Sequence, residues 1–316
     1  MKLTRKLTSG VVIILLALTF FAVIMPLQDE AHATVAKAAV KKAKTYSKSA
    51  NKLFKVKGCW YCFSRKKVKK GLQKVGSNYY FFNKSTGKMY LKTGLKKVST
   101  AYYYFKKSSG KAPAYRNKSW KDADGKVWFF KSNGKRYSYS YKDTGSTAGN
   151  TSAGYIISAA KIKPENSATA AQLQTAYKKI VNRSKYIALD VKPITSSSVI
   201  GSYALTAAKK KGGKCYNVAA LTFVTFKALG DNPSLVTGKC TRTGDTAKNQ
   251  DHAWVESDKL VYDAVFDLSK KEMAFMGKEK DELHGKDYKN KEFKLSGVDA
   301  AYKDYMYTPD KQNTFK

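Results

Sequence analysis

Clusters of aromatic residues recur at nearly even spacing in the first half of the chain. Three of them end at Phe82, Phe105 and Phe130, which lie 23 and then 25 residues apart, and a glycine follows each cluster. A weaker unit ends at Phe63. Aromatic runs between glycine turns are typical of β-hairpins, and repetition at this period is typical of small stacked units that share a core. Residues 53–142 are therefore predicted to form a solenoid of β-hairpin repeats.

The pattern changes to helical spacing from residue 155 onward. Apolar side chains recur every three or four positions in residues 169–182, and a second, shorter helix is predicted over residues 202–209. Lys214 and Cys215 open a segment whose residues 218–229 are apolar on nearly every side, and Gly230 follows them. This pattern predicts a buried central helix that ends at a glycine.

A β-hairpin is predicted further along this half of the chain. Residues 251–256 alternate between polar and apolar side chains, a polar turn follows, and residues 260–266 return as a second strand. A two-residue loop would make His252 and Asp263 direct or diagonal neighbours on one face of the hairpin. Asp267 has the same parity but lies four residues further along, so Asp263 is the better partner for His252.

Cys215 lies at the start of the predicted central helix and follows a pair of glycines. The positive end of a helix dipole favours the thiolate over the thiol, and the thiolate is the nucleophile. A nucleophile of this kind needs a base. Of the three histidines, His32 lies near the N-terminus and His284 in a charged, loop-like stretch that is typical of a protein surface, which leaves His252. Cys215, His252 and Asp263 are therefore the candidate catalytic residues, with Asp263 orienting the imidazole and the Cys215 amide as one oxyanion donor.

Three segments resemble motifs of the bacterial transglutaminase-like superfamily: Gly213-Lys214-Cys215-Tyr216-Asn217, His252-Ala253-Trp254-Val255-Glu256 and Val261-Tyr262-Asp263. The resemblance covers roughly residues 170–267. It implies an α+β, papain-like catalytic domain whose central helix carries the cysteine at its N-terminus and packs on an antiparallel sheet. It also implies acyl chemistry through a thioester that water or an amine attacks, with no metal or organic cofactor. Hydrolysis and transamidation share the first half-reaction, so both remain open.

The aromatic repeats resemble the cell-wall-binding repeats of Gram-positive surface proteins, which include the choline-binding type. Gly71-Leu72 and Gly94-Leu95 stand where that family usually has Gly-Trp, and only Trp120 keeps the tryptophan. The resemblance implies attachment to cell-wall polysaccharide or to an anionic wall polymer, while a tryptophan-lined choline site is in doubt. The alternative is that the aromatic residues only hold a thin solenoid together.

Three further cysteines are interpreted as structural or solvent-facing thiols. Cys59 and Cys62 form a Cys-x-x-Cys motif, which could suggest zinc or redox chemistry. In the repeat register, however, they lie three positions apart on one strand and therefore face opposite sides. Cys240 is placed on a strand after the central helix.

The N-terminus has the pattern of an export signal. Lys2, Arg5 and Lys6 precede an apolar run, and Ala31-His32-Ala33 fits a cleavage site, so residues 1–33 are predicted to be a signal peptide. A retained N-terminal membrane anchor is the alternative. No later segment is apolar enough to span a bilayer.

Composition completes the predicted organisation. Residues 34–52 are expected to be a Lys/Ala-rich spacer, residues 143–154 a linker, and residues 155–316 the transglutaminase-like domain. The formal net charge is +37, from 60 Lys and Arg against 23 Asp and Glu, which favours polyanionic partners. No nucleic-acid-binding motif accompanies this charge, so no specific nucleic acid is expected.

These features together predict a secreted, cell-wall-associated cysteine acyl hydrolase or acyltransferase that acts on peptide or protein amides. The alternative is a non-catalytic wall-binding adhesin or scaffold with a degenerate transglutaminase-like domain.

Overall fold

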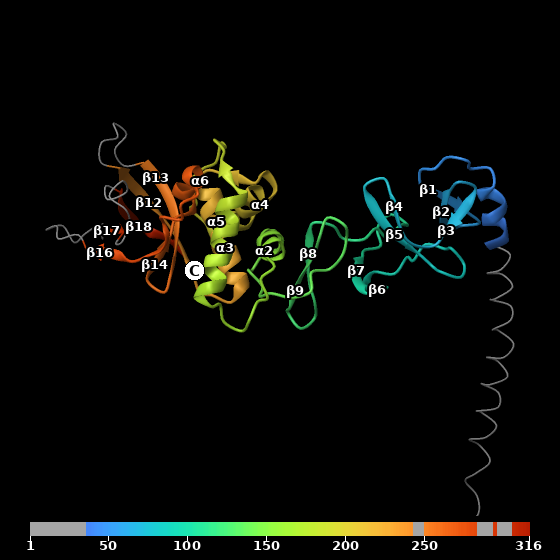
Figure 1. The fold of residues 1–316 in the computed structure, drawn as a ribbon, viewed down its shortest axis with the longest axis horizontal. Helices are drawn as coiled ribbons and strands as arrows, with labels where there is room; N and C mark the ends of the chain where they lie inside the picture. The colour runs from blue at the N-terminus through green and yellow to red at the C-terminus, as the bar shows by residue number, and fades with distance from the viewer. Residues whose placement is uncertain (1–35, 243–249, 283–292, 296–304) are drawn as a thin grey trace, which may run out of the picture. The chain divides into compact units, whose positions relative to one another are not determined.

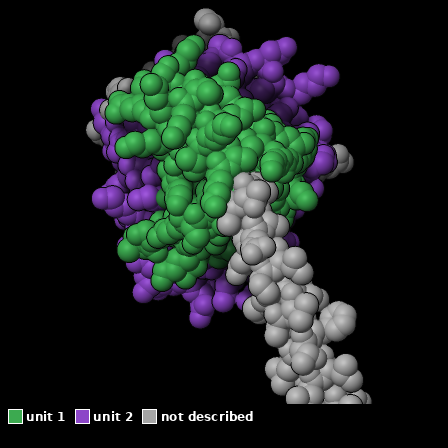
Figure 2. Space-filling model, turned by 90° about the vertical axis from the view of Figure 1, so that its right-hand side faces the viewer, with its two compact units in different colours: residues 1–115 green, residues 116–316 purple. Residues whose placement is uncertain are grey.

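The structure, a computed structural model, describes residues 36–242, 250–282, 293–295 and 305–316. The chain divides into two compact units, residues 1–115 and residues 116–316 (Figure 2). The predicted signal peptide, residues 1–33, lies outside the described residues. In the described ranges, no helix combines the length and the apolar character that crossing a membrane requires.

The first unit consists of antiparallel hairpins (Figure 1). Its strands are β1 (Lys52–Val56), β2 (Cys59–Ser64), β3 (Lys67–Lys69), β4 (Gly71–Val75), β5 (Asn78–Phe82), β6 (Gly94–Val98) and β7 (Ala101–Phe105). The pairs β4–β5 and β6–β7 have the same register, in which the first glycine of the repeat faces its last phenylalanine. Phe63, Phe82 and Phe105 are fully buried. The predicted hairpins that end at Phe63, Phe82 and Phe105 are confirmed, and buried aromatic residues of neighbouring hairpins pack together.

The expected spacer at residues 34–52 is not a spacer in its described part. Residues 36–43 are helical, and Ala39 and Ala43 are fully buried against the hairpin residues Tyr61 and Phe63. Two alanines four positions apart form a flat, small face on a helix, which lets the helix approach the aromatic rings closely. Lys37, Lys41 and Lys42 lie on the exposed side of this helix.

The expected linker at residues 143–154 is also mostly structured. Residues Thr147–Ala160 form α2, whose N-cap Ser146 accepts a hydrogen bond from the Gly149 amide. The small residues of this segment suggested a flexible linker, but in the structure they allow α2 to pack closely against its neighbours. A Cβ at Gly154 would lie 2.5 Å from a ring carbon of Phe129. The second unit therefore begins before the predicted boundary.

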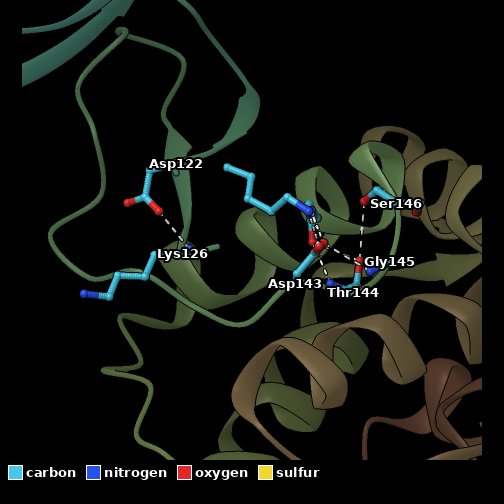
Figure 3. Close-up of polar contacts among 8 residues, drawn as sticks. Asp122, Lys126, Asp143, Thr144, Gly145 and Ser146 are labelled. Atoms are coloured by element: carbon cyan, nitrogen blue, oxygen red, sulfur yellow. Dashed lines mark hydrogen bonds and ion pairs between the residues drawn. The ribbon is translucent and has the colours of Figure 1, made fainter. Parts of the chain in front are cut away.

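The third hairpin, β8 (Lys118–Lys121) and β9 (Val127–Phe130), belongs to the second unit. It is tied to α2 because the Ser119 amide donates to the Thr151 hydroxyl at 3.2 Å. Figure 3 shows how carboxylates hold the adjoining turns. Asp122 accepts from the Lys126 amide at 2.9 Å, and Asp143 accepts from the Gly145 amide at 3.1 Å.

Three helices of the second unit match the sequence expectations. They are α3 (Ala170–Arg183), α4 (Ile200–Lys210) and α5 (Cys215–Leu229). A short 3-10 helix, Ser197–Val199, precedes α4. α5 is buried along nearly its whole length, and it ends at Gly230 in the left-handed conformation with φ 97°. The predicted buried central helix is therefore confirmed.

A seven-stranded antiparallel sheet accompanies these helices, in the order β15-β14-β13-β12-β18-β17-β16. The strands are β12 (Ser234–Arg242), β13 (Gln250–Ser257), β14 (Leu260–Tyr262), β15 (Met276–Lys278), β16 (Lys280–Glu282), β17 (Phe293–Leu295) and β18 (Tyr305–Phe315). Ala253 and Val255 on β13 join the core around α5, whereas Trp254 joins a second cluster with Tyr307. Helices with an antiparallel sheet agree with the α+β part of the predicted fold class.

The predicted hairpin has the expected turn but a shorter second strand. Val255 faces Tyr262 and Ser257 faces Leu260, which leaves the two-residue loop Asp258-Lys259 with positive φ at both positions. The strand ends at Tyr262, and α6 (Ala264–Lys270) follows. The expectation of a strand through Phe266 is wrong, because these residues form a short helix in which Ala264 and Leu268 are buried in the core around α5.

Gly212 fixes the approach to α5 and offers a test of the fold. It pairs in parallel with Lys185 as part of β11 (Gly212–Gly213) and β10 (Lys185–Tyr186), with φ 142°. A Cβ there would overlap the Lys185 carbonyl oxygen. We expect Gly212→Ala to lower the free energy of unfolding by about 3 kcal/mol, since backbone strain and a clash with backbone add together.

The control is Gly125→Ala, because Gly125 also has a positive φ, 78°, but has open space around its Cα. Its expected cost is about 1 kcal/mol. Urea denaturation followed by circular dichroism measures both variants. Equal losses would show that the contact with Lys185 does not constrain position 212.

Candidate active site

Cys215 is the first residue of α5, and the backbone before it sets this position. Lys214 is extended, with φ −75° and ψ 176°, and its amide donates to the Asn217 side-chain oxygen at 3.3 Å. The Cys215 side chain is partly buried, and its sulfur lies 3.9 Å from the Asp251 carbonyl oxygen, to which the thiol donates. The thiol therefore lies at the positive end of a buried helix and beside the strand that carries His252.

His252 and Asp263 form a buried pair. The imidazole Nε2 lies 2.5 Å from the Asp263 Oδ2, and the two residues are 5 % and 1 % exposed. His252 comes from β13, whereas Asp263 is the residue between the end of β14 and the start of α6. With Nε2 donating to the carboxylate, Nδ1 is the ring nitrogen left for a second partner.

The charge of this pair favours the imidazolium. Burial by itself lowers the pKa of His252, but the negative charge of Asp263, its hydrogen bond and the Cys215 thiol together raise the pKa to about 10. The thiol contributes both a hydrogen bond and a charge interaction to this shift. At neutral pH the ring is therefore protonated between a carboxylate and a thiol, an arrangement that suits a thiolate–imidazolium pair.

Aromatic rings enclose the imidazole. Phe266 on α6 stacks on it with a centroid distance of 4.6 Å and an interplanar angle of 18°. Trp254 lies parallel to the ring at 6.2 Å, and Tyr307 lies at the same distance with a tilt of 51°. These rings keep water away from the His252–Asp263 bond, which strengthens it, and they favour a cationic ring through their π faces.

Tyr307 is a member of the site that the sequence did not reveal. Its hydroxyl donates to the Asp263 Oδ2 at 3.0 Å, so this one oxygen accepts from both Tyr307 and His252. Burial first, and then the Asp263 charge, raise the pKa of Tyr307 well above its ordinary value, so the phenol stays a neutral donor. The other carboxylate oxygen, Oδ1, is buried without a hydrogen-bond partner among the described residues.

Asp267 and Cys240 are near enough to Asp263 for its charge to affect their pKa, but neither takes the place of Asp263 beside His252. Asp267 accepts from the Tyr177 hydroxyl at 2.6 Å, and burial, its largest influence, raises the pKa of Asp267 to about 6. Cys240 is buried, and burial followed by the charges of Asp263 and Cys215 raises its pKa. His284 lies outside the described residues.

Cys59 and Cys62 are separate thiols, as the strand parity predicted. They belong to different hydrophobic clusters of the first unit, and neither is in a disulfide. Burial raises the pKa of Cys62 to about 11. The described ranges contain no group of three or more His, Cys, Asp or Glu side chains arranged to hold a metal ion.

The His252–Asp263 pair predicts a pH dependence of stability. His252 binds its proton more tightly when folded, with a pKa of about 10, than when unfolded, with a pKa of about 6.5. The pair's contribution is therefore complete below about pH 6.5 and is lost as the pH rises toward 10. At pH 6 we expect the free energy of unfolding of wild type to exceed that of His252→Gln by about 3–5 kcal/mol, because the variant leaves the buried Asp263 charge without a cationic partner.

Urea denaturation of both proteins at several pH values measures this difference, and the subtraction removes the titration of the many lysines. The difference should shrink steadily on the alkaline side. A difference that stays constant from pH 6 to pH 10 would mean that His252 is not charged in the folded protein.

Comparison with known proteins identifies one part of the chain. Residues 70–89, which contain β4 and β5, match the family described as "Putative cell wall binding repeat". No curated protein sequence matches the chain.

Solved structures with similar parts include two from Streptococcus pneumoniae. Choline binding protein F has 25% identity, covers 29% of this chain and 32% of its own, and gives a TM-score of 0.22. CbpJ has 22% identity over 31% of each chain, with a TM-score of 0.23. This chain thus spans about a third of the length of these proteins.

Another similar structure is the arylamine N-acetyltransferase from Mycobacterium abscessus. It has 14% identity, covers 51% of this chain and 62% of its own, and gives a TM-score of 0.32.

Among these comparisons, the match of residues 70–89 to the repeat family is the one that supports a conclusion about this chain. Residues 70–89 are thus similar to a cell-wall-binding repeat of the choline-binding type, and such repeats imply a cell-wall-associated protein.

Proposed function

We propose that the second unit is a cysteine acyl hydrolase or acyltransferase that acts through a thioester on peptide or protein amides at the cell wall. The observation that carries this proposal is the buried His252–Asp263 pair beside a thiol at a helix N-terminus. A buried carboxylate that keeps an imidazole charged is costly to maintain in a fold. A charged, buried pair next to a thiol is typical of a catalytic site, where it activates the nucleophile.

The proposed reaction begins when the Cys215 thiolate attacks the carbonyl carbon of an amide. The carbonyl π electrons move to oxygen, and the resulting oxyanion accepts a hydrogen bond from the Cys215 amide in the first turn of α5. When the tetrahedral intermediate collapses, its C–N bond breaks and His252 donates its Nδ1 proton to the leaving amine. The acyl group remains on sulfur as a thioester.

The second half-reaction regenerates the thiolate. Neutral His252 takes a proton from water or from an acceptor amine, which attacks the thioester carbon. The C–S bond then breaks to release an acid or a new amide. Asp263 stays ionised throughout, since it holds the imidazole by Nε2 and stabilises the charged ring.

Thiol labelling tests the proposal without knowledge of the substrate. At neutral pH, iodoacetamide should modify Cys215 much faster than the buried Cys240, and His252→Ala should slow the reaction of Cys215 because the imidazolium that stabilises the thiolate is lost. Mass spectrometry of peptides after timed exposure measures both rates. Equally slow labelling of both cysteines, unchanged in His252→Ala, would favour a non-catalytic adhesin or scaffold.

A substrate screen then distinguishes the two acyl acceptors. Wall peptides and glutamine-containing proteins are incubated with wild type and with Cys215→Ala, with and without a labelled primary amine. Ammonia or new amino termini without label indicate a hydrolase. Incorporation of the amine indicates a transferase.

A further inference from the structure

The described part of the first unit is cationic without any internal compensation. Residues 36–115 contain 22 Lys and Arg and no Asp or Glu. The second unit differs, because its lysines include ion-paired examples such as Lys121 with Asp143. No lysine of residues 36–115 has a carboxylate side chain within that range to pair with. A protein surface with this composition concentrates anions and repels cations.

Lysines of the first unit also cover its aromatic rings. The Lys96 ammonium lies 4.7 Å from the ring centroids of both Phe81 and Tyr90, and the Lys111 ammonium lies 4.7 Å from that of Trp60. A quaternary ammonium such as choline binds aromatic faces in this manner. In this unit the lysine ammonium groups already lie over these ring faces, and the positive potential of the surrounding lysines opposes the binding of a further cation.

The aromatic side chains of the described part of this unit are buried or half-buried. Among the described residues, Tyr139 and Tyr186 are the aromatic side chains classed as exposed, and both belong to the second unit. Stacking on nucleobases needs exposed aromatic faces, and so does stacking on sugar rings. The side chains that this unit exposes most include many lysines, whose ammonium groups act as point charges toward phosphate.

We propose that the first unit binds a wall polymer with an anionic phosphodiester backbone, rather than choline or bare glycan. This inference rests on the wall association of the repeats and does not depend on the proposed chemistry of Cys215. Each lysine–phosphate contact is weak in water, but a polymer of regularly spaced phosphates engages many of them at once. The repeat architecture matches such a ligand, since each hairpin presents lysines to solvent.

Cosedimentation of the full chain with purified Gram-positive cell walls tests this proposal. One sample of walls is intact and the other is treated with hydrofluoric acid, which cleaves phosphodiesters and leaves peptidoglycan. We expect the treatment to weaken binding at least about tenfold, and rising salt to release the protein from intact walls. Choline chloride should not elute it. Equal binding to both wall preparations, or elution by choline, would overturn the proposal.

Matched charge variants distinguish binding by lysines of the first unit from attraction by the net charge of the whole protein. Lys55→Glu with Lys67→Glu and Lys70→Glu changes three exposed lysines of the first unit. The control triple, Lys163→Glu with Lys178→Glu and Lys209→Glu, changes three exposed lysines of the second unit and gives the same net charge. We expect only the first triple to weaken wall binding, by about tenfold or more. Equal losses in the two triples would overturn the proposal, and circular dichroism verifies that both variants fold.

Two further measurements complete the test. Cys215→Ala should bind walls like wild type, so a failure of the enzymatic proposal leaves this one unaffected. The protein is also titrated with purified wall teichoic-type polymer and with double-stranded DNA at matched phosphate concentration and salt. Tighter binding to DNA would make the unit a nucleic-acid-binding module and would contradict a wall ligand.

Discussion

Cys215→Ala is expected to lower kcat/KM for amide substrates by about 10⁴-fold or more, because no other group can form the acyl intermediate. The fold should remain, since Cys215 is only partly buried and alanine favours a helix. Activity is followed by ammonia release and by amine incorporation, with denaturation curves recorded alongside. The Asp263 charge would still hold His252 in place, so the stability of the site is expected to change little.

Cys59→Ala serves as the matched control, since it removes a partly buried thiol from the first unit. Its kcat/KM should equal that of wild type. If both variants retained the activity of wild type, another group would be the nucleophile and the proposed thioester would be wrong.

Asp263→Asn is expected to reduce kcat by about 10³–10⁴-fold. Asparagine keeps the shape of the carboxylate but removes the charge that opposes the effect of burial on His252. The pKa of His252 should therefore fall well below 10, because burial is then its dominant influence. In wild type the alkaline limb of the kcat/KM profile should lie near pH 10, and in the variant it should move to lower pH.

The control for this prediction is Asp267→Asn, which makes the same chemical change at a carboxylate bound by Tyr177. Its pH profile should follow that of wild type even if its stability falls. An unchanged alkaline limb in Asp263→Asn would show that this carboxylate does not set the protonation of the imidazole. Nitrogen NMR of the His252 ring reports the same titration directly.

The parts of the site that the sequence predicted depend on local rules. A helix that starts at Cys215 and ends at Gly230 follows from an apolar segment between glycines. The pairing of His252 with Asp263 follows from the two-residue turn, because hairpin register depends on loop length. Both arguments need only residues that are close in sequence.

Tyr307 could not be predicted in this way. It lies 44 residues after Asp263, and β18 enters the sheet between β12 and β17. Alternation along a strand shows which residues share a face, but it does not say which strand lies next to it. The tyrosine's contact with the carboxylate is therefore a property of the sheet order.

The errors in the predicted boundaries have a different origin. Residues 143–154 are rich in Gly, Ser, Thr and Ala, a composition that flexible linkers share with tightly packed helices. Whether such a segment is a linker or a helix depends on the residues that pack against it. Here Phe129 packs against Gly154, a contact that the composition of the segment does not reveal. The apolar residues after Asp263 were similarly ambiguous, since a short apolar run fits a strand or a helix equally well.

The position of β18 also determines when the candidate site can form during synthesis. The strand that supplies Tyr307 is translated after every other described strand of the sheet, yet it lies inside the sheet next to β12. A nascent chain that has not reached residue 307 lacks one of the two donors to Asp263 and has an unpaired edge on β12. A partly synthesised chain would therefore hold the cysteine, histidine and aspartate without the Tyr307 hydrogen bond to Asp263.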